Sequence, residues 1–157
     1  MNEPQFWMGG HLATDLIAVT NNPKDIDDGF WAVTTTFDGH FTGAKFANLE
    51  ERTWSEQYRP LQSKKWSSSH SKEEYCQLVE NFRQEIADGY VYQVNACRVL
   101  TNESNEEISG LLAGFLKNNP ARFAGYLNIP GLEIASASPE TFLIRNGETL
   151  ISSPIKG

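Results

Sequence analysis

Three two-residue turn signals, each flanked by strand-forming residues, constrain the fold of this chain most strongly. Asp38-Gly39 and Asn146-Gly147 readily adopt the positive φ angles of a tight β-hairpin turn, and Pro130-Gly131 is a further turn dipeptide. The runs beside them are rich in β-branched and aromatic residues, as strands are. They cover residues 30–37, 41–47, 122–128, 132–138, 141–145 and 148–152. The sequence therefore predicts three antiparallel hairpins, with a further strand at 15–20.

Two amphipathic helices are predicted between these hairpins. The first begins at Ser71, because Ser71 and Glu74 can satisfy each other's free amides in a capping box, and Gly89 ends it as a left-handed C-cap. The second begins near Ser104 and ends at Asn119-Pro120. The apolar stripe of the first helix consists of Tyr75, Leu78, Val79, Phe82 and Ile86, and that of the second of Ile108, Leu111, Leu112, Phe115 and Leu116.

The remaining segments complete an α+β pattern. Residues 48–58 are charged and helix-like, residues 59–70 are an exposed connector, and residues 90–100 are predicted to form a long strand. This order of elements favours mostly antiparallel sheets with helices on their outer faces.

Charge and composition exclude several classes of function. A net charge of −7 is unlike that of a nucleic-acid binder, which needs a basic face. No apolar run approaches the roughly 18 residues of a membrane-spanning helix, and the first residues lack the pattern of a signal peptide. Cys76 and Cys97 are too few for a disulfide scaffold. We therefore expect a cytoplasmic protein with reduced thiols that binds neither nucleic acid nor membranes.

The sequence predicts no metal site within this chain. His11, His40 and His70 are spread along it, and none lies at helical i+3 or i+4 spacing from another ligand.

Lys156 is the best candidate for a chemically active residue. It stands in Pro154-Ile155-Lys156-Gly157, directly after the last predicted hairpin. Ser153 and Lys156 also match the S-x-x-K pattern of penicillin-recognising enzymes, but that pattern requires a helix. On the strand predicted here the two side chains point to opposite faces, so this reading is rejected.

Several segments together resemble the chorismate-utilising enzymes. Tyr92-Gln93-Val94-Asn95 resembles that family's Tyr-Gln-Val-Asn strand, and residues 119–123 resemble its Asn-Pro-Ser-Pro-Tyr segment. Ser138-Pro139-Glu140 and Pro154-Ile155-Lys156-Gly157 resemble its Ser-Pro-Glu and Pro-Ile-Lys-Gly-Thr motifs. The order and separations agree over residues 72–157, which would be the first part of a chorismate-binding domain. Residues 1–71 would be a variable, β-rich N-terminal part.

The resemblance implies both a fold and a reaction. The family's fold is a sandwich of large antiparallel sheets flanked by helices. Lysine at position 156 is typical of aminodeoxychorismate synthase component I, whereas anthranilate synthases carry alanine there. In such a synthase Lys156 would attack chorismate, and Gly157 would let the backbone approach the substrate. Ammonia would come from a glutamine amidotransferase subunit. The product would be 4-amino-4-deoxychorismate, the precursor of p-aminobenzoate and folate.

The chain also departs from the family pattern. Ala121 and Arg122 replace the family's serine and proline in a segment that forms a tryptophan pocket in some relatives. Asn119 and Phe123 are the residues of this candidate regulatory pocket. The family's Mg²⁺ ligands and the arginine that binds the substrate carboxylate follow the lysine motif, so we expect them beyond this sequence. We therefore expect these 157 residues to be an N-terminal portion and not a complete catalyst.

Three alternatives stay open. The chain could belong to an anthranilate synthase-type or bifunctional relative, which lysine at position 156 disfavours. It could be a noncatalytic remnant that binds a partner. It could also be a generic small-molecule binder in which Lys156 is exposed and titrates normally.

Overall fold

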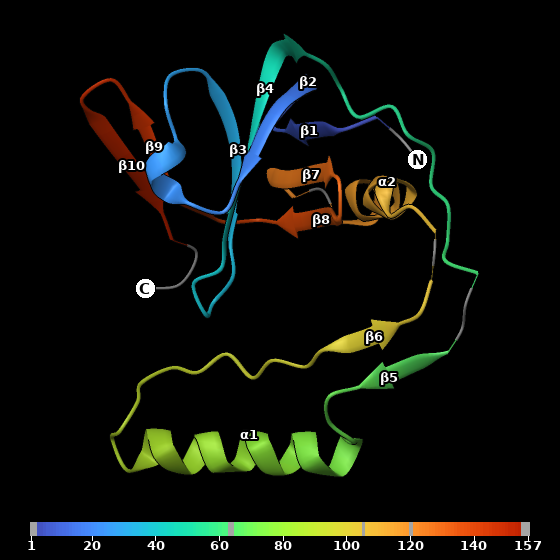
Figure 1. Ribbon diagram of the computed structural model, residues 1–157. Coiled ribbons are helices and arrows are strands. Elements are labelled where there is room, and N and C mark those ends of the chain that lie inside the picture. Colours follow the sequence, from blue (N-terminus) through green and yellow to red (C-terminus); the bar gives the residue numbers. More distant parts are fainter. Residues whose placement is uncertain (1–2, 63–64, 105, 120, 155–157) are drawn as a thin grey trace. The chain divides into compact units, whose positions relative to one another are not determined.

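The computed structural model describes residues 3–62, 65–104, 106–119 and 121–154 (Figure 1). Antiparallel sheet and two α-helices make up its regular structure, which confirms the predicted α+β class. The chain divides into two compact units: residues 1–60 with 107–157 (unit 1), and residues 61–106 (unit 2). The sequence-based division between residues 71 and 72 stays a prediction.

Unit 1 is built on a six-stranded antiparallel sheet with the strand order β3-β4-β2-β1-β7-β8. The strands are β1 (Gln5–Met8), β2 (His11–Thr20), β3 (Phe30–Thr35), β4 (Phe41–Glu51), β7 (Phe123–Ile129) and β8 (Leu132–Ser138). A short 3₁₀ helix, η1 (Pro23–Asp25), precedes β3. Strands β9 (Thr141–Asn146) and β10 (Thr149–Ser153) form a separate two-stranded sheet.

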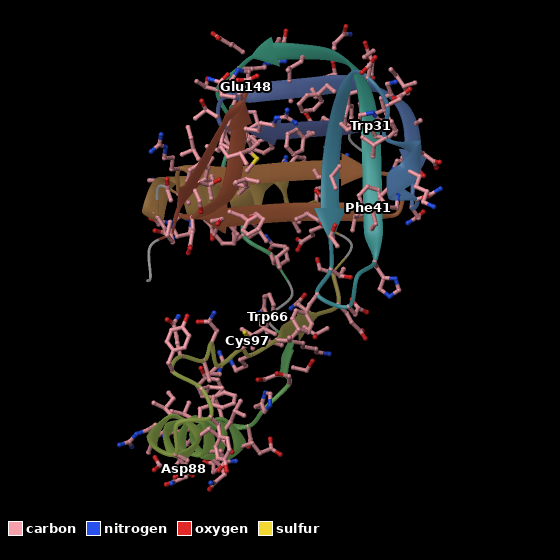
Figure 2. All side chains as sticks on the ribbon, turned by 90° about the vertical axis from the view of Figure 1, so that its left-hand side faces the viewer. Trp31, Phe41, Trp66, Asp88, Cys97 and Glu148 are labelled. Atoms are coloured by element: carbon pink, nitrogen blue, oxygen red, sulfur yellow. The ribbon has the colours of Figure 1, made fainter. Side chains whose placement is uncertain are left out.

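All three predicted hairpins are confirmed. Gly39, Gly131 and Gly147 have positive φ angles of 89°, 81° and 59°, the backbone region that favours glycine. They lie in the turns of β3–β4, β7–β8 and β9–β10 respectively. Glu148 follows Gly147 in the last of these turns (Figure 2). The turn dipeptides thus determine the pairing within these three hairpins.

Each face of the six-stranded sheet has its own core. On one face, helix α2 (Ser109–Asn118) packs on β7 and β8. The core on that face contains Trp7, Leu12, Leu112, Ala121, Ala124 and Tyr126. The core on the other face joins β2, β3 and β4 to β7 and contains Ala13, Ala32, Ala44, Phe46, Leu127 and Ile129. Neighbouring residues of β7 therefore alternate between the two cores, as strand geometry requires.

Unit 2 contains α1 (Lys72–Ala87) and the strand pair of β5 (Trp66–Ser68) and β6 (Leu100–Asn102). The predicted capping box is confirmed: Ser71 Oγ accepts the Glu74 amide at 3.2 Å, and Glu74 accepts the Ser71 amide at 2.8 Å. Asp88 is the C-cap (Figure 2), and Gly89 follows with a φ of 80°. No residue of α1 is buried. Its apolar stripe therefore does not form a core within the described part of unit 2.

Three sequence predictions are wrong. The strand at 90–100 is irregular except at its end, because only Leu100–Asn102 finds a partner strand. The helix at 48–58 does not form, since β4 continues to Glu51 in pairing with β2. Helix α2 begins at Ser109, and Ser104 instead accepts the amide of Glu106. Sequence reasoning missed strand β1, and it also missed β5 (Trp66–Ser68), which lies within the predicted connector 59–70.

None of the described helices is long and apolar enough to cross a membrane.

Candidate functional site

A pocket of about 290 Å³ lies in unit 1 against strands β1, β3, β7 and β8. Antiparallel pairing builds it: Met8 of β1 lies opposite Gly125 of β7, and Gly125 lies opposite Ser136 of β8. Phe123 and Ser138 form the next pair on the same face. Residues that line the pocket include Phe6, Met8, Phe123, Ser136, Ser138 and Glu140.

The pocket combines apolar walls with a few polar groups. Ser138 holds the start of the following turn, because its hydroxyl donates to the Glu140 carbonyl at 3.0 Å and accepts the Glu140 amide at 3.3 Å. This double contact fixes the backbone of Glu140 at the pocket. A small molecule with an apolar ring and polar substituents suits such a lining.

The segment that leads toward Lys156 lies close to this pocket. Ser153 of β10 pairs with Thr141 of β9, and Thr141 also lines the pocket. Lys156 and Gly157 themselves lie outside the described residues. Their roles therefore stay predictions.

The two residues of the candidate regulatory pocket lie in different surroundings. Phe123 is half-buried and lines the 290 Å³ pocket. Asn119 is the C-cap of α2, where its amide donates to the Phe115 carbonyl at 2.7 Å, and it is not among the pocket residues. Sequence reasoning missed Phe6 and Met8, because β1 is only four residues long and carries no turn signal.

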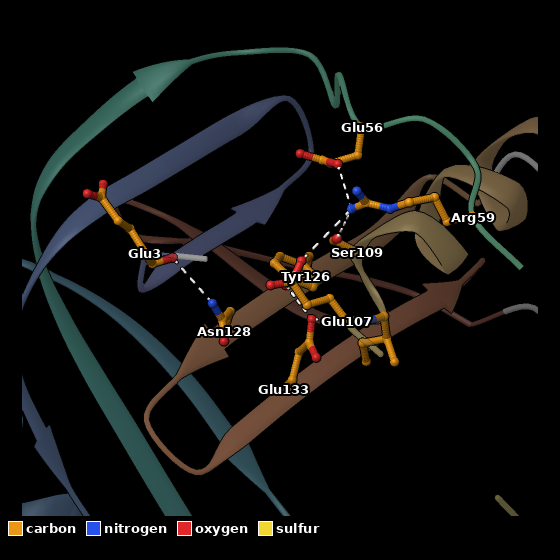
Figure 3. A network of polar contacts seen from close by, with 9 residues as sticks. Glu3, Glu56, Arg59, Glu107, Ser109, Tyr126, Asn128 and Glu133 are labelled. Carbon is orange, nitrogen blue, oxygen red and sulfur yellow. Dashed lines mark hydrogen bonds and ion pairs between the residues drawn. The ribbon is translucent and has the colours of Figure 1, made fainter. Parts of the chain in front are cut away.

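A second polar cluster lies on the α2 side of β7 and β8 (Figure 3). The Tyr126 hydroxyl donates to Glu133 Oε1 at 2.5 Å, and the same oxygen accepts the Ile108 amide at 3.1 Å. The pKa of the Tyr126 hydroxyl is raised, mainly because the hydroxyl is buried. The hydrogen bond to Glu133 and the negative charges of Glu133 and Glu107 raise it further. Nearby, Arg59 Nη2 lies 3.0 Å from Glu56, 3.1 Å from Ser109 Oγ and 4.0 Å from Glu107. The polar groups of this cluster thus find hydrogen-bond or ion-pair partners within the fold, and we interpret the cluster as structural.

Across the described ranges of the chain, no three His, Cys, Asp or Glu side chains are grouped so that they could hold a metal ion. The Mg²⁺ that the family resemblance implies stays a prediction.

Comparison with known proteins agrees with the motifs. The family model described as chorismate binding enzyme matches residues 15–157. The aminodeoxychorismate synthase component 1 of Bacillus subtilis is 24% identical over 93% of this chain and 32% of its own length. That of Escherichia coli is 30% identical over 73% of this chain and 25% of its own length.

An anthranilate synthase component 1 of Haloarcula marismortui is 29% identical over 59% of this chain and 19% of its own length. The chain thus spans less than a third of each of these relatives. No solved structure matches it significantly. The family match covers far more than half of the sequence, and the chain belongs to the chorismate binding enzyme family.

Proposed function

We propose that this chain is part of an aminodeoxychorismate synthase component I, which converts chorismate and ammonia into 4-amino-4-deoxychorismate. The observation that carries the proposal is lysine at position 156, within a family match that runs to residue 157. Relatives of that name in Bacillus subtilis and Escherichia coli support it. The product would feed p-aminobenzoate and folate synthesis in the cytoplasm.

The proposed chemistry has two displacement steps. The Lys156 amine forms a bond to C2 of chorismate, the ring double bonds shift, and the 4-hydroxyl departs with a proton as water. Ammonia then bonds to C4, the double bonds shift back, and the C2–nitrogen bond breaks to release the lysine. The sum is chorismate plus ammonia giving 4-amino-4-deoxychorismate plus water. No oxidant or reductant is needed.

Lys156 must be neutral to begin this sequence. An unperturbed lysine has a pKa of about 10.4, so roughly one molecule in a thousand is neutral near pH 7.4. An apolar surrounding or a nearby cation would raise that fraction. Gly157 would allow the backbone to approach the substrate, because glycine has no Cβ.

The remaining parts of the proposal concern the complete protein. The ammonia would come from a glutamine amidotransferase partner, and the fold would be the sandwich of antiparallel sheets that the resemblance implies. The ligands of Mg²⁺ would lie on segments other than those described. Because Phe123 lines the 290 Å³ pocket, binding of a regulatory ligand should be tested there. Asn119→Ala, at a residue that does not line this pocket, is the comparison variant.

Two alternatives remain to be separated from this proposal. An anthranilate synthase-type activity is favoured by the similarity to the Haloarcula marismortui enzyme. A noncatalytic, partner-binding role would follow if the natural product were only these 157 residues.

The test begins with the intact mass of the protein from its natural source, because the activity must be assayed at its natural length. That protein is incubated with chorismate and ammonia, and separately with chorismate alone. We expect 4-amino-4-deoxychorismate in the first case and, in the second, an adduct on Lys156 with the mass of chorismate minus one water. Lys156→Ala should abolish both, whereas Lys117→Ala, which removes a lysine in the last turn of α2, should abolish neither.

Each other outcome counts against the proposal in a different way. Formation of anthranilate without a lysine adduct would replace it by the anthranilate-type alternative. Absence of any turnover at the natural length would favour the noncatalytic one.

A further inference from the structure

Unit 2 is inserted between two neighbouring points of unit 1. The chain leaves unit 1 after residue 60 and returns at residue 107. The chain segments at both points contact one side chain, Arg59 (Figure 3). Its guanidinium lies 3.1 Å from Ser109 Oγ and 4.0 Å from Glu107, on the returning segment, and 3.0 Å from Glu56 on the departing one.

Backbone contacts join the same two segments. The Arg59 amide donates to the Gly110 carbonyl at 3.3 Å. A Cβ atom at Gly110 would lie 2.7 Å from Arg59 Cβ and 2.9 Å from Arg59 N. One at Gly114, a turn later in α2, would lie 2.6 Å from the Tyr58 ring. Residues 58–59 therefore lie directly against the glycine face of α2, formed by Gly110 and Gly114, where an added Cβ atom would contact Arg59 or the Tyr58 ring.

The two units differ in how many apolar side chains they bury. Both apolar cores consist of unit 1 residues, and α2 contributes Leu112, which is fully buried, to one of them. In unit 2, α1 has no buried residue. Segments with little burial open more readily than core elements.

We infer that Arg59 and the glycine face of α2 form a clasp that joins the two chain ends of the insertion, so that unit 1 keeps its structure when residues 61–106 open. Arg59 is suited to this role because the guanidinium is planar and can donate to several oxygens at once. The compact ammonium of a lysine has a different donor geometry.

Hydrogen exchange of the full 157-residue chain, followed by mass spectrometry, tests the clasp. In the unsubstituted chain we expect amides of residues 72–104 to exchange at least about tenfold faster than those of Arg59 and Leu112. If both units instead exchange together as one cooperative body, the inference is wrong. This measurement needs no variant.

A pair of matched variants then tests Arg59 itself. Arg59→Gln should speed exchange in residues 54–60 and 107–112 by roughly three- to tenfold, with β2–β4 unchanged. Arg52→Gln is the control, because Arg52 is equally exposed (57% against 56%) and forms one exposed ion pair, with Glu50. It should leave residues 54–60 and 107–112 unchanged. Equal effects of the two variants there, or uniform acceleration across unit 1, would overturn the role of Arg59.

Discussion

Glu133 on β8 caps helix α2, because its carboxylate accepts the amide of Ile108, the N-cap residue 25 positions earlier in the sequence. Helix α2 has no side-chain cap of its own. The Glu133 carboxylate oxygen that accepts the Ile108 amide also accepts the Tyr126 hydroxyl, so one side chain joins α2 to both strands of the β7–β8 hairpin. A carboxylate at this end of a helix also interacts favourably with the helix dipole.

Replacing Glu133 should destabilise unit 1. Glu133→Ala leaves the Ile108 amide and the Tyr126 hydroxyl without this acceptor, and an unsatisfied buried donor costs roughly 1–3 kcal/mol. Glu133→Gln keeps an acceptor oxygen and loses mainly the charge, so its cost should be about 0.3–1 kcal/mol. Urea unfolding followed by circular dichroism measures both. Equal losses for the two variants would contradict the proposed capping role.

Alanine in α2 should have opposite effects on helix propensity and on packing. Alanine normally stabilises a helix by up to about 1 kcal/mol over glycine. At Gly110, however, the new Cβ would meet the backbone nitrogen of Arg59, which cannot move away without disturbing the segment. We therefore expect Gly110→Ala to cost about 1–2 kcal/mol, as overpacking does.

Gly114→Ala is the matched comparison. Its Cβ would meet only the Tyr58 ring, which is more than half exposed and can rotate away. Its free energy of unfolding should stay within about 0.5 kcal/mol of the unsubstituted chain, because the gain in propensity offsets the shift of the ring. A larger loss at Gly114 than at Gly110 would show that packing against Tyr58 matters more than the backbone contact.

The features that sequence reasoning found are those with local causes. The hairpins at Gly39, Gly131 and Gly147 were predictable because their turns need a positive φ angle, which few residues other than glycine adopt readily. The capping box of α1 involves two residues three positions apart.

The features that it missed depend on distant partners. The start of α2 is set by Glu133, not by Ser104, and only the folded hairpin brings Glu133 to that place. Strand β1 owes its place to pairing with β7, more than 110 residues away, as in Gln5 opposite Asn128. Residues 52–60 stay extended or irregular, since Trp54 packs between Trp7 and Tyr126 with ring centroids 5.4 and 5.0 Å away. For the candidate site, the sequence named Phe123 as a residue of a possible regulatory pocket and Ser138-Pro139-Glu140 as a family motif, but no local pattern could show that β1 lines the same pocket.

Acid should weaken the contacts of Asp27. The hydrogen bond from Lys45, at 2.6 Å, and then the one from Trp31 lower the pKa of this exposed carboxyl. A carboxyl with a lowered folded-state pKa contributes stability above its unfolded pKa of about 3.9, and this is lost as the pH falls through the folded value. Titration of the Asp27 carboxyl by NMR should thus give a pKa below about 3.9. Lys45→Met should raise it, whereas Lys24→Met, in the neighbouring η1, should change it much less.

Alkali should destabilise unit 1 through Tyr126. Burial and the contact with Glu133 raise the pKa of its hydroxyl, so between the unfolded value of about 10 and the higher folded value only the unfolded chain loses this proton. Because the folded state then binds more protons than the unfolded state, the free energy of unfolding must fall as the pH rises above about 10. Urea unfolding at a series of alkaline pH values should show this fall, and Tyr126→Phe should reduce its slope. Tyr90→Phe, at an exposed tyrosine, is the control and should leave the slope unchanged. An equal slope for Tyr126→Phe and the unsubstituted chain would mean that other groups, such as the lysines, cause the alkaline loss.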